Sequence, residues 1–191
     1  KAGAFGVHVW LPGTYTEADD DLTALLSAVI SKVAMFGLLV GTYLAVRSEA
    51  DLGLTYGLAW VGLLTTVAGA LMALRQDDFK RMLAYSSMSQ LGYIITAIAL
   101  MSHLGWVTAL YLVANHMMVK GILFLGLAAI VLRTGERSFA GLGGLARAMP
   151  VTFALFLFAI VSMSGLPPLM GFGGKWLLLS GMSEKGWYGL V

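Results

Sequence analysis

The sequence predicts an all-α multi-pass membrane protein that forms part of an inverted-repeat helical bundle with discontinuous helices. Hydrophobic residues make up 59% of the 191 residues and charged residues only 12%, which leaves too little polar surface to cover a water-soluble domain. The apolar residues lie in runs of roughly 20, the length of helix that crosses the hydrocarbon of a bilayer. Breaks rich in glycine and proline near both ends of the chain favour broken helices in two related halves.

Four apolar runs are bounded by charges and predict one membrane-spanning helix each. They extend from Leu22 to Val46, Leu54 to Leu74, Leu83 to Met101 and Trp106 to Leu132. A fifth apolar region, from Val151 to Met182, is too long for one simple span. Its middle reads "SGLPPLMGFGGKW", where two prolines and four glycines oppose continuous helical hydrogen bonding. This region therefore predicts a discontinuous helix.

The first residues, "KAGAFGVHVWLPG", predict the tail of another span, which should end at Pro12 and Gly13. Lys1 precedes one irregular Gly/Pro stretch and Lys175 follows another, as in transporters built from repeats. The chain does not begin with methionine and ends inside an apolar run. We therefore expect it to be a piece of a longer polypeptide.

The loop charges predict the orientation of the chain in the membrane. Lysine and arginine are concentrated in alternate loops, and loops of this kind face the cytoplasm. The predicted cytoplasmic side carries Arg75, Lys80, Arg81, Arg133, Arg137 and Arg147, whereas Arg47 and Lys185 fall on the other side. We expect an integral protein of the cell inner membrane, in contact with the lipid bilayer.

Basic residues occur where the bilayer should exclude them. Lys120 lies near the centre of its predicted span, and His116 precedes it by one helical turn, so the two share a face and form a titratable pair. Lys32 lies near the middle of its own span, and Lys175 follows the Gly/Pro break. No acidic residue falls inside any predicted span. These lysines must be hydrated, neutral, or paired with carboxylates from elsewhere.

Several classes of function lose support from the composition. The chain has no cysteine, which excludes disulfides, iron–sulfur ligation and thiolate chemistry. No pattern predicts a cofactor, a metal site or binding to nucleic acid. A lysine Schiff-base chromophore would need an intramembrane counter-ion, which the predicted spans lack. Two classes remain: proton transport through the buried bases, and a structural membrane subunit whose lysines pair with partner subunits.

Four motifs in order along the chain resemble the antiporter-like proton-channel family. They are "HVWLPG", "DDFKRMLAYSSMSQLGY", "NHMMVKGILFLG" and "SGLPPLMGFGGKWLLL". The family comprises the large membrane subunits of respiratory complex I, their relatives in membrane-bound hydrogenases, and the Mrp-type cation/proton antiporters. Its fold is two inverted repeats of five helices. The resemblance implies that residues 1–47 end the first repeat and that residues 54–191 form most of the second, within one proton-conducting domain over 1–191.

The resemblance also implies roles for individual residues. Lys1 looks like the broken-helix lysine of the first repeat, Lys32 like the central relay lysine, and Lys120 with His116 like the proton site of the second repeat. Lys175 looks like the broken-helix residue toward the exit. Family members usually carry a proline in place of Gly6 and an "APTP"-like stretch where this chain has "TEADDDLTA", so the subfamily stays open.

The resemblance implies partner subunits but no electron-transfer role for this chain itself. The chain should work beside other membrane subunits of a multisubunit complex, with protons as the transported ion and sodium left open as a second. It carries no redox centre of its own. If it belongs to a proton-translocating NADH-quinone oxidoreductase or a hydrogenase, other subunits carry the electrons.

Overall fold

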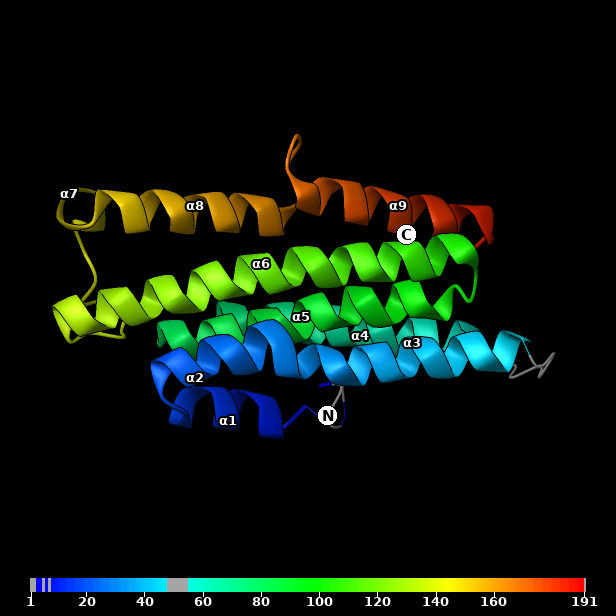
Figure 1. The fold of residues 1–191 in the computed structure, drawn as a ribbon, viewed down its shortest axis with the longest axis horizontal. Helices are drawn as coiled ribbons and strands as arrows, with labels where there is room; N and C mark the ends of the chain where they lie inside the picture. The colour runs from blue at the N-terminus through cyan, green and yellow to red at the C-terminus, as the bar shows by residue number, and fades with distance from the viewer. Residues whose placement is uncertain (1–2, 5, 7, 48–54, 191) are drawn as a thin grey trace.

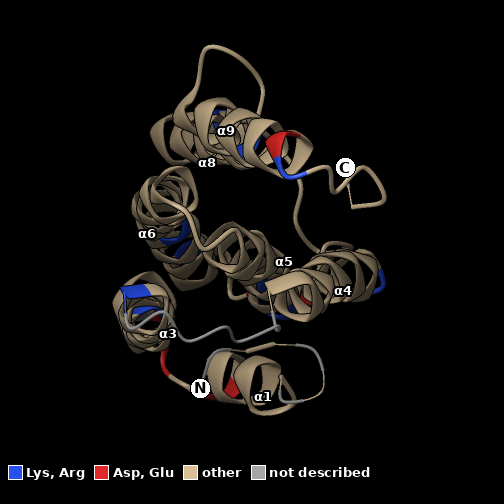
Figure 2. Ribbon diagram, turned by 90° about the vertical axis from the view of Figure 1, so that its right-hand side faces the viewer, with Lys and Arg blue, Asp and Glu red and all other residues tan. Residues whose placement is uncertain are grey.

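A computed structural model describes residues 3–4, 6, 8–47 and 55–190. Figure 1 shows the long helices side by side along one axis, and Figure 2, turned by 90°, shows α5 among the others. The elements are α1 (Trp10–Glu17), α2 (Asp20–Leu25), a π-helical segment (Leu26–Ile30), α3 (Ser31–Arg47), α4 (Thr55–Leu74), α5 (Phe79–Ala99), α6 (His103–Thr134), α7 (Leu145–Ala148), α8 (Pro150–Ser164) and α9 (Met170–Glu184).

Within the described residues, three helical stretches are long and apolar enough to cross a membrane, which confirms three of the predicted spans. They are Leu22–Arg47, Thr55–Leu74 and His103–Thr134. The predicted span from Leu83 to Met101 is also one helix, α5, whose 21 residues measure about 32 Å. This helix is less apolar because it lies in the middle of the bundle, where its hydroxyls and Lys80 contact protein. The predicted all-α membrane fold is confirmed.

The predicted discontinuous helix is present as α8 and α9, which lie end to end in Figure 1 with a loop projecting between them. Gly165 ends α8 with a φ of 86°, a conformation that glycine adopts without strain. The break is shorter than the run of glycines suggested, because Gly174 lies inside α9. A Cβ there would come within 2.7 Å of the Leu112 side chain, so this glycine permits close packing on α6.

The N-terminal prediction is partly wrong. Helix α1 runs through Pro12 and Gly13 to Glu17 and does not end at them. Pro12 lies in the first turn, where its missing N–H costs no intrahelical hydrogen bond. Lys1 lies outside the described residues.

Basic residues of alternate loops gather at one end of the bundle, as the loop charges required. The end of α4, the start of α5, the end of α6 and the start of α8 all lie at the left of Figure 1. Arg81 and Arg137 belong to this end. That it faces the cytoplasm stays a prediction.

Helices α4 and α5 pack through glycines that bring their backbones together. A Cβ on Gly92 would lie 2.6 Å from both the Gly62 carbonyl oxygen and the Thr66 nitrogen. One on Gly69 would lie 2.6 Å from the Ser89 nitrogen. Small residues at such crossings let membrane helices approach closely, because apolar burial alone does not drive them together in lipid.

We expect Gly92→Ala to lower the free energy of unfolding by about 1–3 kcal/mol, because the added methyl forces two backbones apart. Gly121→Ala is the matched control. Gly121 also lies inside a helix, but a Cβ there meets no atom within 4 Å, so its stability should stay the same or rise by about 1 kcal/mol. Thermal unfolding of the intact protein in detergent measures both, and equal effects would contradict the proposed contact.

Candidate functional site

Lys120 is fully buried, with 0% of its surface exposed, and its ammonium group is satisfied by oxygens of α5. It donates hydrogen bonds to the Leu83 carbonyl at 3.0 Å and to the Ser86 Oγ at 2.5 Å. The ring of Phe124 lies 5.9 Å from the Nζ and adds a weak cation–π contact. Neutral dipoles therefore surround this charge, with no carboxylate contacting it among the described residues.

Lys32 is 5% exposed and is held by its own helix through the π-helical segment. In this segment the Ser31 N–H bonds the Leu26 carbonyl, one residue further back than in an α-helix. The Ser27 carbonyl then accepts side-chain donors: the Ser31 hydroxyl at 3.0 Å and the Lys32 ammonium. Lys32 also donates to the Ser31 Oγ at 2.9 Å. The local change of helix type thus creates an oxygen site for a buried amine.

His116 is near enough to Lys32 and Lys120 for their charges to act on it, but it forms no hydrogen bond with either lysine among the described residues. It is 2% exposed, and the charges of Lys32 and Lys120 both act on it. Neither ring nitrogen has a hydrogen-bond partner within the part of the chain that the structure describes. Its i, i+4 spacing from Lys120 places both on one face of α6, as the sequence indicated.

Lys175 belongs to a separate part of the site, at the helix break. Its Nζ donates to the Met163 carbonyl at 2.9 Å and to the Ser164 carbonyl at 3.1 Å, and it lies 5.1 Å from the centre of the Tyr93 ring. The last carbonyls of a helix carry partial negative charge and have no acceptor role within it. Lys175 therefore caps the C-terminal end of α8.

A polar contact connects α6 with the same helix end. The Ser162 hydroxyl donates to the Asn115 Oδ1 at 3.2 Å, and both side chains are buried. Asn115 is the neighbour of His116, and Ser162 precedes the carbonyls that hold Lys175. The break in the helix is thus linked to α6 next to His116.

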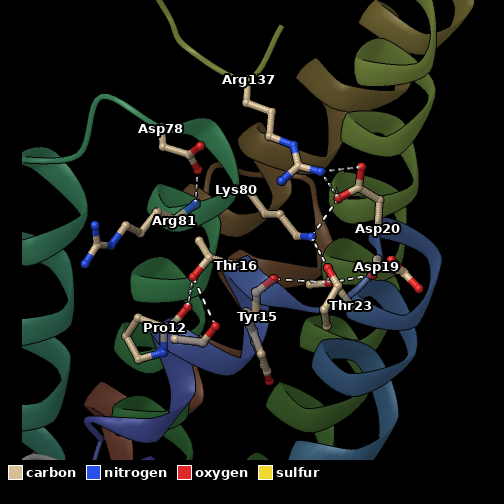
Figure 3. A network of polar contacts seen from close by, with 12 residues as sticks. Pro12, Tyr15, Thr16, Asp19, Asp20, Thr23, Asp78, Lys80, Arg81 and Arg137 are labelled. Atoms are coloured by element: carbon tan, nitrogen blue, oxygen red, sulfur yellow. Dashed lines mark hydrogen bonds and ion pairs between the residues drawn. The ribbon is translucent and has the colours of Figure 1, made fainter. Parts of the chain in front are cut away.

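Sequence analysis missed an ion-pair cluster at the end of the bundle that holds the basic loops. Figure 3 shows the Asp20 carboxylate between Lys80 and Arg137, at 2.6 Å and 3.2 Å. Lys80 is only 1% exposed and also donates to the Ala18 carbonyl at 2.5 Å. The sequence placed Lys80 among the orienting loop charges, and the acidic residues after Glu17 were the signal that it has a partner.

The structure brings together three of the five residues that the sequence singled out: Lys32, His116 and Lys120. Lys175 lies apart, at the broken helix that the sequence predicted, and there it contacts backbone carbonyls. The three lysines can hold positive charge in buried positions, because hydroxyls and carbonyls replace water around each amine.

Comparison with known proteins places this arrangement in a family. All of residues 1–191 match the family described as NADH:quinone oxidoreductase/Mrp antiporter, TM. The chain belongs to this family. The resemblance drawn from the four motifs is confirmed, and with it an integral membrane protein of the antiporter-like class.

Individual relatives agree with the family match. The chain is 36% identical to NADH-quinone oxidoreductase subunit N of Desulforudis audaxviator, over 97% of this chain and 37% of the relative. It is 35% identical to formate hydrogenlyase subunit 3 of Escherichia coli, over 93% of this chain and 31% of the relative. A chain of the Mrp complex from Dietzia sp. DQ12-45-1b superposes with a TM-score of 0.94 at 28% identity, over 100% of this chain and 35% of that chain.

The chain therefore spans about a third of the length of the relatives it matches. Family relatives are subunits of multisubunit membrane complexes, in agreement with the expected membrane partners.

We expect Asp20→Asn to lower the free energy of unfolding by about 3 kcal/mol, because it leaves the buried Lys80 ammonium without a counter-charge. The double variant Asp20→Asn with Lys80→Met should regain much of that loss, since it removes the unpaired cation. Asp19→Asn changes an exposed neighbour and is the control. Thermal unfolding in detergent measures all three. An Asp20→Asn protein as stable as Asp19→Asn would show that the cluster contributes nothing.

Proposed function

We propose that this chain moves protons across the membrane through Lys32, His116, Lys120 and Lys175, with Lys1 as a further member from the resemblance. The observation that supports this most directly is the row of buried basic side chains on α3 and α6 whose described contacts are hydroxyls and carbonyls. An ion-pair lattice would hold a fixed charge at each lysine. Dipoles hold an amine whether or not it carries its extra proton.

Electrostatic coupling links the protonation of neighbouring sites in the row. The charge of Lys32 acts on Lys120, and both act on His116. In a medium of low dielectric constant, a proton on one member repels a proton on the next. Loading from one side therefore favours release at the other. In this scheme protons enter from the cytoplasmic side, reach Lys32, pass to His116 and Lys120, and leave by way of Lys175.

The helix break supplies the exit end of this path. Lys175 contacts the free carbonyls of α8, and Asn115 and Ser162 connect that helix end with α6. Non-helical backbone at membrane depth is tolerated where it lines a polar cavity or is buried in protein. We assign the Gly165–Leu169 loop to such a position.

The wider setting follows from the relatives and belongs to the same proposal. The chain would act as an antiporter-like subunit of a complex I-like or Mrp-type assembly in the cell inner membrane. Partner subunits would supply the driving force, either electron transfer or a sodium gradient, and sodium stays open as a second transported ion. Lys32, Lys120 and Lys175 contact hydroxyls and carbonyls and no carboxylate among the described residues, and the chain matches only 37% of a relative such as subunit N.

We expect Lys120→Met in the intact protein to lower proton flux into vesicles by roughly a hundredfold or more, the range produced when a proton-transferring group is lost. Methionine fills a similar volume, so the complex should still assemble. Lys185→Met is the matched control, because Lys185 is exposed at the end of α9, and its flux should equal that of the unmodified protein.

Two outcomes would contradict the proposal. Retained flux in Lys120→Met would remove this residue from the path. Failure of the same variant to assemble, with Lys185→Met assembling normally, would favour a structural subunit whose buried lysines hold its partners. Flux in vesicles and the subunit content of the purified complex are therefore measured on the same preparation.

A further inference from the structure

Serine hydroxyls lie close to both Lys32 and Lys120, and the scheme above does not use the contact between two of them, Ser27 and Ser87. Ser27 and Ser31 come from the π-helical segment and the start of α3, and Ser86 and Ser87 come from α5. Ser27, Ser31 and Ser87 are all buried. Buried hydroxyls in a membrane bundle lose their contact with water on insertion, so these three need hydrogen-bond partners within the protein.

The contacts in this cluster form a bridge from one lysine to the other. Ser27 Oγ and Ser87 Oγ lie 3.3 Å apart, and either can donate. On one side of this contact, the carbonyl of Ser27 itself accepts from Lys32. On the other side, the Leu83 carbonyl accepts from the Ser87 hydroxyl at 2.9 Å and from Lys120 at 3.0 Å. The serine pair thus joins the two backbone segments that hold the two amines.

The Ser87 hydroxyl has one hydrogen and two acceptors within reach. Directed at Leu83, it shares that carbonyl with Lys120. Directed at Ser27, it leaves the Leu83 carbonyl to Lys120 and to the Ser86 hydroxyl, which donates to the same oxygen at 2.9 Å. A hydroxyl can make this exchange by rotating about one bond, because it both donates and accepts. The orientation of the pair therefore depends on how strongly Lys120 uses the Leu83 carbonyl.

We propose that Ser27 and Ser87 are positioning residues that couple Lys32 to Lys120, in addition to the electrostatic influence of His116. This inference rests on the proposed function, since it assumes that both lysines exchange protons. The contact holds the π-helical segment against α5, so that the amines keep the separation needed for transfer. His116 has no hydrogen-bond partner among the described residues. The serine pair reaches the lysines through backbone carbonyls: Lys32 donates to the Ser27 carbonyl, and Lys120 and the Ser87 hydroxyl donate to the same Leu83 carbonyl.

The test measures proton flux in vesicles for Ser27→Ala, Ser87→Ala and the double variant in the intact protein. Each single change should lower flux by roughly three- to tenfold, as expected for one lost hydrogen bond. The double variant should be no slower than the worse single variant, because both changes remove the same contact. Ser87→Thr keeps the hydroxyl and should restore flux.

Ser89→Ala is the matched control, because Ser89 is another buried serine of α5 but lies against Gly69 of α4. Its flux should stay at the level of the unmodified protein. Thermal unfolding of every variant separates a loss of coupling from a loss of folded protein. If Ser87→Thr does not fold, the comparison of single and double variants decides.

The outcomes separate this inference from the proposed function. Unchanged flux in both alanine variants, with flux abolished in Lys120→Met, would overturn the serine bridge and leave the proton path intact. Strictly multiplicative losses in the double variant would also overturn it, since the two serines would then act independently. Flux retained in Lys120→Met would overturn the proposed function itself.

Discussion

The arrangement depends on one constraint: an ammonium group inside a bilayer must find oxygens within the protein. Lys120 obtains them from α5, Lys32 from the turn that precedes it, and Lys175 from the end of α8. Each case uses a carbonyl that a regular helix leaves available or that side chains share. Lys32 and Lys175 therefore lie beside irregular places in the backbone, whereas Lys120 shares a carbonyl of the regular helix α5 with serine hydroxyls.

The sequence predicted the parts of this arrangement that depend on composition and local breaks. Runs of apolar residues predicted the spans, and Gly165 with the two prolines that follow predicted the broken helix. The i, i+4 spacing predicted that His116 and Lys120 share a face. These features follow from one segment at a time. Hydropathy and helical geometry are therefore enough to find them.

The remaining features depend on which segments meet, and local patterns do not contain that information. Nothing near Lys32 in the sequence distinguishes a π-helical turn from an α-helical one, since Leu26–Ile30 is an ordinary apolar stretch with one serine. Lys80 resembled a loop charge because its partner, Asp20, is 60 residues away. Pro12 suggests a helix end in the sequence, because a proline can either stop a helix or lie in its first turn. Only the start of α1 at Trp10 shows that it lies in the first turn.

The Asp20 cluster has a consequence for biosynthesis. Asp20 leaves the ribosome first, Lys80 follows after 60 residues, and Arg137 is added 117 residues after Asp20. The acid is thus already present when the basic start of α5 emerges, and that lysine can be charge-balanced before the second half of the chain is made. Arg137 is the last of the three to be made, and its exposed guanidinium lies on the outer side of the cluster.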